Sequence, residues 1–157
     1  MKLTIQKEVQ MLRGVSLFRS VKPEDLKIIA LTTTNYIYES GEIIINEGDE
    51  GDDAYIIYTG RVEVFRKGTD VKIITLNTLG PGEMFGELAL FGDSIRTASV
   101  KAVEETVVSI IAKEKLYKII REFPDIAIEM LKVQTSRFAE AEKKLIEFIN
   151  VGEDIST

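Results

Sequence analysis

The most informative part of this sequence is the stretch GPGEMFGELALFGDSIRTASV, residues Gly80–Val100. Gly86 stands directly before Glu87 in this stretch, and because glycine has no side chain, a ligand can approach the backbone closely there. Glu87 begins a short run compatible with a helix, Leu88–Phe91, whose first N–H groups have no intrahelical partner. Together these features indicate a site for a small anion.

Arg96 is the only positive charge in this stretch, and the hydroxyl residues Thr97 and Ser99 are close to it in sequence. A guanidinium can bind a phosphate through two parallel hydrogen bonds, each worth roughly 1.5–3 kcal/mol when sheltered from water. The Glu87 carboxylate would repel that phosphate unless it faced another group, and as an acceptor-only group it suits a sugar hydroxyl. Arg96 and Glu87 therefore suggest a ribose phosphate as ligand.

Short β-rich runs, separated by Gly and Asp, fill residues 36–112 around this stretch. Seven or more strands at such close spacing predict an antiparallel sandwich or barrel, and we expect a jelly roll, that is, a double-stranded β-helix. Thr59-Gly60 predicts a tight hairpin and Lys67–Asp70 a longer one. The predicted strands are Tyr36–Tyr38, Ile43–Ile45, Tyr55–Tyr58, Val62–Phe65, Val71–Leu76, Ala98–Val103 and Val107–Ile111.

Both flanks of this β-rich region have helical periodicity. Residues 1–35 predict two short amphipathic helices, with Pro23 in the first turn of the second. Residues 113–150 predict two more, the first ending near Phe123-Pro124 and the second running from about Asp125 to Asn150. We expect one mainly β domain over residues 1–157, with these last two helices as a lid.

The long C-terminal helix carries apolar residues at sevenfold spacing. Leu131, Phe138 and Leu145 form one stripe, and Ala141 and Phe148 fill a second. Two alternatives remain open: the stripe pairs with a second copy of the chain, giving a homodimer, or it lies on the barrel.

The composition of the chain excludes several common kinds of catalytic site. The 157 residues include no Cys and no His, which excludes disulfides, Cys/His zinc sites, thiol nucleophiles and imidazole bases, and we expect neither metal nor cofactor. A net charge of −6 gives no electrostatic footprint for nucleic acid, and a DNA-reading domain would have to follow Asn150. No apolar run approaches the roughly 20 residues of a membrane span, so we expect a cytoplasmic protein without membrane or nucleic-acid partners.

Phe85–Leu90 followed by Arg96–Val100 closely resembles the phosphate-binding cassette of cyclic nucleotide-binding domains. That family includes the catabolite activator proteins, the regulatory subunits of cyclic-nucleotide-dependent kinases and the cyclic-nucleotide-gated channels. The resemblance covers nearly the whole chain, because further matches fall in the family's order and spacing: Gly41-Glu42, Glu47–Asp49, Tyr55–Gly60 and Pro81-Gly82.

The resemblance implies a role for each matching residue. Arg96 would bind the phosphate, helped by the Thr97 hydroxyl and the Ala98 N–H, while Glu87 and Gly86 would hold the ribose 2′-hydroxyl. Apolar residues at 64, 76 and 85 would surround the base. The implied ligand-binding set is Val64, Leu76, Phe85, Gly86, Glu87, Leu88, Ala89, Arg96, Thr97, Ala98 and Arg137.

We therefore expect a sensor, not an enzyme, that binds cAMP or cGMP and moves its C-terminal helices to signal to an effector protein. A Thr at position 97 resembles the cGMP-selective kinases, but the channels carry the same string and accept both nucleotides, so cAMP is favoured on the family-wide tendency. Catabolite activators place hydroxyl residues where this chain has Ala141 and Glu142, so adenine recognition by that route is not expected here.

Three other interpretations of the sequence are possible: an enzyme, an interaction protein and a calcium-binding loop. A cupin-like enzyme would need an all-carboxylate metal site that the sequence does not display. A structural or dimeric interaction protein with a vestigial nucleotide pocket is the main alternative. The acidic run Glu47–Asp53 fails as a calcium loop, because Ala54 and Gly60 stand where an EF-hand needs Gly and Glu, and we expect a solvated turn.

Overall fold

The computed structural model describes residues 2–70 and 72–156. Met1, Val71 and Thr157 lie outside the described residues, and with them the first residue of the predicted strand Val71–Leu76 and both ends of the predicted domain. The elements in chain order are α1 (Ile5–Gly14), the 3₁₀ turn η1 (Ser16–Phe18), α2 (Pro23–Thr32), β1 (Thr34–Tyr38), β2 (Ile43–Ile45), β3 (Asp53–Thr59), β4 (Val62–Lys67), β5 (Ile73–Leu79), β6 (Met84–Phe85), α3 (Leu88–Phe91), β7 (Ser99–Ala102), β8 (Thr106–Ala112), α4 (Lys113–Glu122) and α5 (Pro124–Ser156).

The strands form two antiparallel sheets, which confirms the predicted jelly roll. One sheet has the order β1-β8-β3-β6 and the other the order β2-β7-β4-β5. Each predicted strand overlaps an observed one, and the two-residue β6 was not predicted. Apolar side chains from both sheets fill the space between them: Ile45, Tyr55, Ile57, Val62, Phe85, Val100 and Val108.

The predicted hairpin at Thr59-Gly60 is wrong, because β3 and β4 belong to different sheets. Gly60 has φ of 102°, and a Cβ there would lie 2.5 Å from the carbonyl oxygen of Glu105. The segment is thus a tightly packed corner at which the chain crosses between sheets. The longer hairpin at Lys67–Asp70 is confirmed, since β4 pairs antiparallel with β5.

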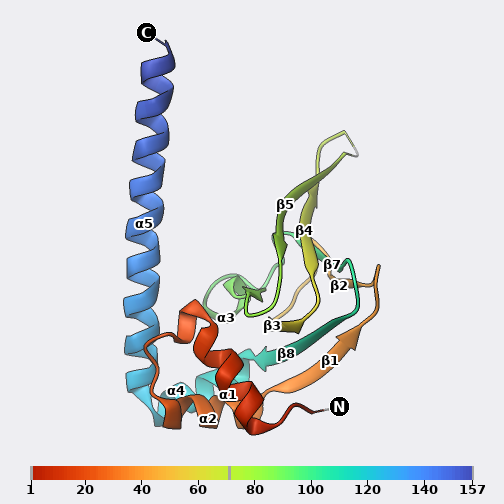
Figure 1. The fold of residues 1–157 in the computed structure, drawn as a ribbon, viewed down its shortest axis with the longest axis vertical. Coiled ribbons are helices and arrows are strands. Elements are labelled where there is room, and N and C mark those ends of the chain that lie inside the picture. The colour runs from red at the N-terminus through yellow and green to blue at the C-terminus, as the bar shows by residue number, and fades with distance from the viewer. Residues whose placement is uncertain (1, 71, 157) are drawn as a thin grey trace.

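Both N-terminal helices begin at residues that favour a helix start: the position of Pro23 confirms its prediction, and the cap at Thr4 was not predicted. The Thr4 hydroxyl accepts a hydrogen bond from Lys7 N at 3.3 Å, and Pro23 opens α2. Both helices pack, with α4 and the start of α5, on the outer face of the first sheet (Figure 1). This second core includes Leu12, Phe18, Leu26, Ile29, Ile56, Ile111, Leu116, Ile126 and Met130.

A buried carboxylate fixes α1 to the first sheet. Glu8 has no exposed surface, and its side chain accepts hydrogen bonds from Ser109 Oγ at 2.8 and 2.9 Å and from Asn35 Nδ2 at 2.7 Å. The Lys2 ammonium lies 3.7 Å away. These partners offset the cost of burying the charge.

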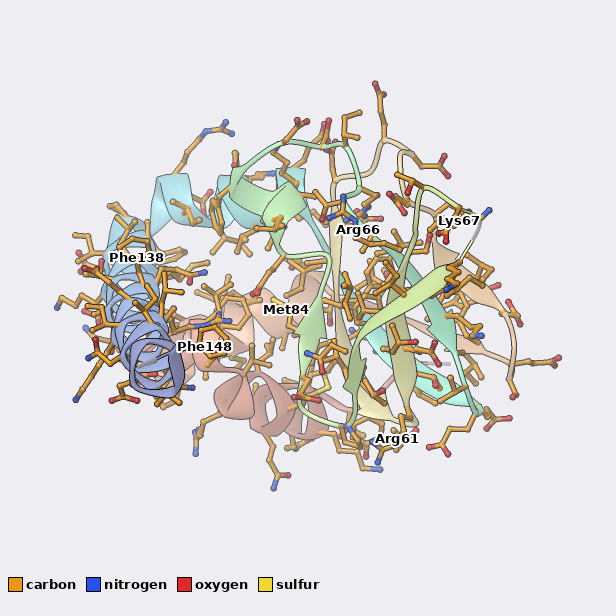
Figure 2. All side chains as sticks on the ribbon, turned by 90° about the horizontal axis from the view of Figure 1, so that it is seen from above. Arg61, Arg66, Lys67, Met84, Phe138 and Phe148 are labelled. Carbon is orange, nitrogen blue, oxygen red and sulfur yellow. The ribbon has the colours of Figure 1, made fainter. Side chains whose placement is uncertain are left out.

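Helix α5 extends further than predicted, to Ser156 instead of Asn150. Gly152 does not end it, because this glycine does not adopt the left-handed conformation of a helix C-cap. Val133 is buried against the body, but Phe138 is 72% and Phe148 76% exposed. Figure 1 shows the upper part of α5 standing clear of the sheets. Figure 2, viewed nearly along the axis of α5, shows both phenylalanines well apart from β4, the strand that carries Arg66 and Lys67. The stripe therefore does not lie on the barrel.

Candidate functional site

A cavity of about 200 Å³ opens between the second sheet and the segment that links β6 to β7. Its walls come from β2, β4, β6, α3 and β7, so residues far apart in sequence meet around it. The lining residues are Ile45, Val64, Phe85, Gly86, Glu87, Leu88, Ala89, Asp93, Ile95, Arg96, Thr97, Ala98 and Val100.

Among the described residues that line the cavity, Arg96 is the only basic one, and it is 9% exposed. Nη2 donates to the carbonyl oxygen of Asp53 at 2.8 Å, and Nη1 donates to that of Gly86 at 3.3 Å. Among the side chains that the structure describes, no carboxylate forms an ion pair with it. The charge is thus held in place by neutral acceptors and is free to meet an anion.

The acidic run Glu47–Asp53 is more than a solvated turn. Glu50 pairs with Ile95 in an isolated antiparallel bridge, and Arg96 N donates to the carbonyl oxygen of Asp49 at 2.8 Å. Asp49 and Glu50 are exposed, so their carboxylates face solvent as expected. Their backbone, however, fixes the strand segment that carries Arg96.

Glu87 stands at the mouth of the cavity, where α3 begins. Its neighbour Gly86 has φ of 74°, a left-handed conformation that favours glycine, and this turn directs the chain from β6 into α3. The Glu87 side chain is 28% exposed, and Oε1 lies 3.7 Å from Nη2 of Arg137 on α5. The carboxylate is therefore accessible to a ligand and partly neutralised by the long helix.

Aromatic residues support the floor of the cavity. The Tyr55 and Phe85 rings are stacked with centroids 4.9 Å apart. Burial raises the pKa of Tyr55, and burial together with the nearby Tyr55 and Tyr36 raises the pKa of Tyr38 to about 12. Both phenols are therefore neutral at ordinary pH.

The structure brings nine of the eleven predicted ligand-binding residues to this cavity: Val64, Phe85, Gly86, Glu87, Leu88, Ala89, Arg96, Thr97 and Ala98. Leu76 does not line it and is 53% exposed, because β5 is the edge strand of its sheet. Arg137 lines a neighbouring cleft that shares Glu87 with the cavity.

Four lining residues were not predicted: Ile45, Asp93, Ile95 and Val100. Ile45 and Val100 are cross-strand partners on β2 and β7. Ile45 and Val100 each lie in a predicted strand. The sequence did not show that their side chains border a cavity, because the face that does so depends on pairing between distant segments.

Residues 2–70 and 72–156 hold no cluster of three or more acidic residues arranged to bind a metal ion. Among the described helices, none has both the length and the apolarity needed to cross a membrane.

The fold and its cavity define a jelly-roll domain with flanking helices and a small pocket whose wall includes a buried arginine. The family model for the cyclic nucleotide-binding domain matches residues 37–123, more than half of the chain. The chain belongs to this family, as its resemblance to the phosphate-binding cassette implied.

Relatives and solved structures agree with this assignment. The cyclic AMP receptor protein of Thermus thermophilus is 32% identical over 134 residues, which are 85% of this chain and 62% of that protein. The N-terminal domain of a transcriptional regulator from Streptomyces coelicolor has a TM-score of 0.79 at 26% identity, covering 86% of this chain and 94% of that one. The regulatory domain of Toxoplasma gondii PKA, solved with cAMP, has a TM-score of 0.69 at 28% identity, covering 73% and 44%.

Proposed function

We propose that this chain binds a 3′,5′-cyclic nucleotide, cAMP in preference to cGMP, and transmits binding through its C-terminal helices as a sensor without catalytic activity. The observation that carries the proposal is the Arg96 guanidinium, sheltered in a cavity wall with carbonyl partners but no carboxylate among the described side chains. A desolvated cation in this state gains most from an anion that fits the cavity. Two relatives support the preference for cAMP: the Thermus protein is a cyclic AMP receptor protein, and the Toxoplasma regulatory domain was solved with cAMP.

The remaining lining residues fit the two ends of a ribose phosphate. In this proposal the phosphate lies against Arg96, with further donors from the Thr97 hydroxyl and the Ala98 N–H. The ribose 2′-hydroxyl lies between Glu87 and the Gly86 backbone at the mouth of the cavity. Val64 and Phe85 provide apolar contacts for the base.

A direct contact between α3 and α4 supports transmission of binding to the helices. The Tyr117 hydroxyl of α4 donates to the carbonyl oxygen of Leu90, and its ring stacks on Phe91 with centroids 5.9 Å apart. A ligand that shifts α3 would therefore also shift α4, and with it α5. The coupling requires that the ligand bind one arrangement of these helices better than the other.

A second candidate function is self-association, and one observation favours it. The free part of α5 exposes Phe138, Leu145 and Phe148, each by more than half of its surface. Phe138 and Leu145 belong to the stripe at sevenfold spacing and Phe148 to the second stripe, and two such stripes on an isolated helix are the pattern of a coiled-coil seam. The two functions are compatible, and only the first needs Arg96.

Calorimetric titration with cAMP and cGMP tests the first function directly. We expect binding by the wild-type chain and a loss of about 3 kcal/mol, or roughly 100-fold, in Arg96→Ala, because two charge-assisted hydrogen bonds are removed. Arg66→Ala is the matched control, since Arg66 is 53% exposed and pairs with Glu47 outside the cavity. Absence of binding at millimolar concentration, or equal binding by Arg96→Ala, would refute the proposal.

A further inference from the structure

Gly51 of the acidic run lies directly against the Arg96 guanidinium. A Cβ built on Gly51 would lie 2.7 Å from both Nε and Nη2 of Arg96 and 3.0 Å from Cζ. Real Cβ atoms essentially never show contacts as short as the two at 2.7 Å, so an alanine at this position would have to displace the guanidinium.

The backbone at Gly51 does not itself require glycine. Its φ lies outside the left-handed region, unlike that of Gly48 in the same run, where φ is 88°. Gly51 N donates to the carbonyl oxygen of Ser94 at 2.9 Å, a hydrogen bond that any residue except proline could make. The three atoms nearest to a Cβ at this position all belong to the Arg96 guanidinium, so this group is the constraint that favours glycine here.

The guanidinium has little freedom to yield. The end of an arginine side chain normally moves away from a new methyl group, but Arg96 is 9% exposed and held by the carbonyl oxygens of Asp53 and Gly86. On that second side, a Cβ on Gly86 would lie 3.0 Å from Nη1. The guanidinium thus lies between Gly51 and Gly86, and the methyl group of an alanine at either position would press against it.

We propose that Gly51 is a positioning residue of the phosphate site: its missing side chain makes room for the Arg96 guanidinium. The proposal rests on the proposed function for its consequence in binding. The proposal also gives the acidic run Glu47–Asp53 a role. The Asp53 carbonyl oxygen accepts from the guanidinium, Glu50 forms the bridge with Ile95, and Gly51 leaves room beside the guanidinium.

The test compares Gly51→Ala with Gly48→Ala in titrations with cAMP. Gly48→Ala strains the same turn, because φ is positive there, but its Cβ meets nothing within 4 Å. We expect Gly51→Ala to weaken binding by about 10- to 100-fold, the value of one charge-assisted hydrogen bond, and Gly48→Ala to weaken it less than threefold or so. Equal losses in the two variants would overturn the proposal, since turn stability alone would then explain both.

A background without the guanidinium separates positioning from general damage. In Arg96→Ala all three atoms that the Gly51 Cβ would meet are gone, and we expect Gly51→Ala to cost less than about threefold in residual affinity there. If Gly51→Ala alone does not fold, the double variant is expected to fold, because the clash has been removed. A double variant that is unfolded, or that shows the full loss in affinity, overturns the proposal.

An NMR measurement without nucleotide keeps this test independent of the proposed function. The Nε–Hε resonance of Arg96, assigned by its loss in Arg96→Lys, is expected to shift in Gly51→Ala and to stay unchanged in Gly48→Ala. If the wild-type chain binds neither nucleotide, the proposed function fails while this resonance still reports on the contact. An unchanged resonance in Gly51→Ala overturns the positioning role, as does unchanged affinity where the wild type binds.

Discussion

Arg137, on the first free turns of α5, lies 3.7 Å from the Glu87 carboxylate at the mouth of the cavity. This ion pair connects the long helix to the residue that we expect to hold the ribose. The side chains are 43% and 28% exposed, so the pair contributes at most about 1 kcal/mol to stability. We therefore expect the pair to matter for ligand binding more than for stability, because Arg137 neutralises a carboxylate near which a phosphate would have to bind.

Replacing Arg137 with Ala is expected to weaken cyclic nucleotide binding by up to about fivefold, because Glu87 then repels the phosphate without compensation. The loss should shrink as salt is added, since exposed charges are screened. Calorimetry at two salt concentrations measures it. Lys132→Ala is the control, because Lys132 pairs with Glu129 on the same helix. Equal effects of both substitutions would contradict a specific role for Arg137.

Thr97→Ala tests how the base is selected. Thr97 lines the cavity beside Arg96. In the proposed function its hydroxyl would donate to the phosphate and, in cGMP, accept a hydrogen bond from the guanine amino group. We expect the affinity for cGMP to fall about fivefold more than that for cAMP, the value of one neutral hydrogen bond. Competition titrations with both nucleotides give the ratio, and an equal loss for both would deny the guanine contact.

The sequence predicted the parts of the molecule that depend on local pattern. The helix start at Pro23 and the cassette from Phe85 to Ala98 were found because each is encoded in a few adjacent residues. Thr59-Gly60 was misread because a turn signal does not reveal whether the next strand joins the same sheet. The role of Gly51 could not be predicted either, since it depends on the bridge between Glu50 and Ile95.

Phe138→Glu combined with Leu145→Glu is expected to abolish self-association through α5. Both side chains are exposed, so the charges cost little in the isolated chain but would be buried in a helix pair. Sedimentation velocity of wild type and variant, with and without cAMP, measures the change. Lys143→Glu, an exposed position outside the stripe, controls for added negative charge. A wild-type chain that is monomeric under all conditions would contradict the second candidate function.

Glu8→Ala is expected to lower the free energy of unfolding by about 2–4 kcal/mol, because it removes the acceptor of the buried Ser109 hydroxyl and one acceptor of the partly buried Asn35 amide. Urea unfolding measures the loss. Glu24→Ala is the control, since Glu24 is an exposed acid in the first turn of α2 and should cost less than about 1 kcal/mol. Similar losses in both variants would show that Glu8 is not the anchor of α1.

Tyr38 makes stability depend on alkaline pH. Its pKa is raised from 10.0 to about 12 in the folded chain, mainly by burial. Below pH 10.0 the phenol is protonated in both states, whereas between 10.0 and about 12 the unfolded chain releases a proton that the folded chain keeps. Stability should therefore fall as pH rises through this window.

Tyr38→Phe isolates this contribution from the other groups that titrate at alkaline pH. The variant has no phenol to ionise at this position, so its free energy of unfolding should fall less steeply than that of the wild type between pH 10.0 and about 12. Urea unfolding across this range, with phenolate absorbance followed in the folded chain, checks both the slope and the late ionisation. Parallel pH profiles for the two proteins would show that Tyr38 ionises at its ordinary pKa.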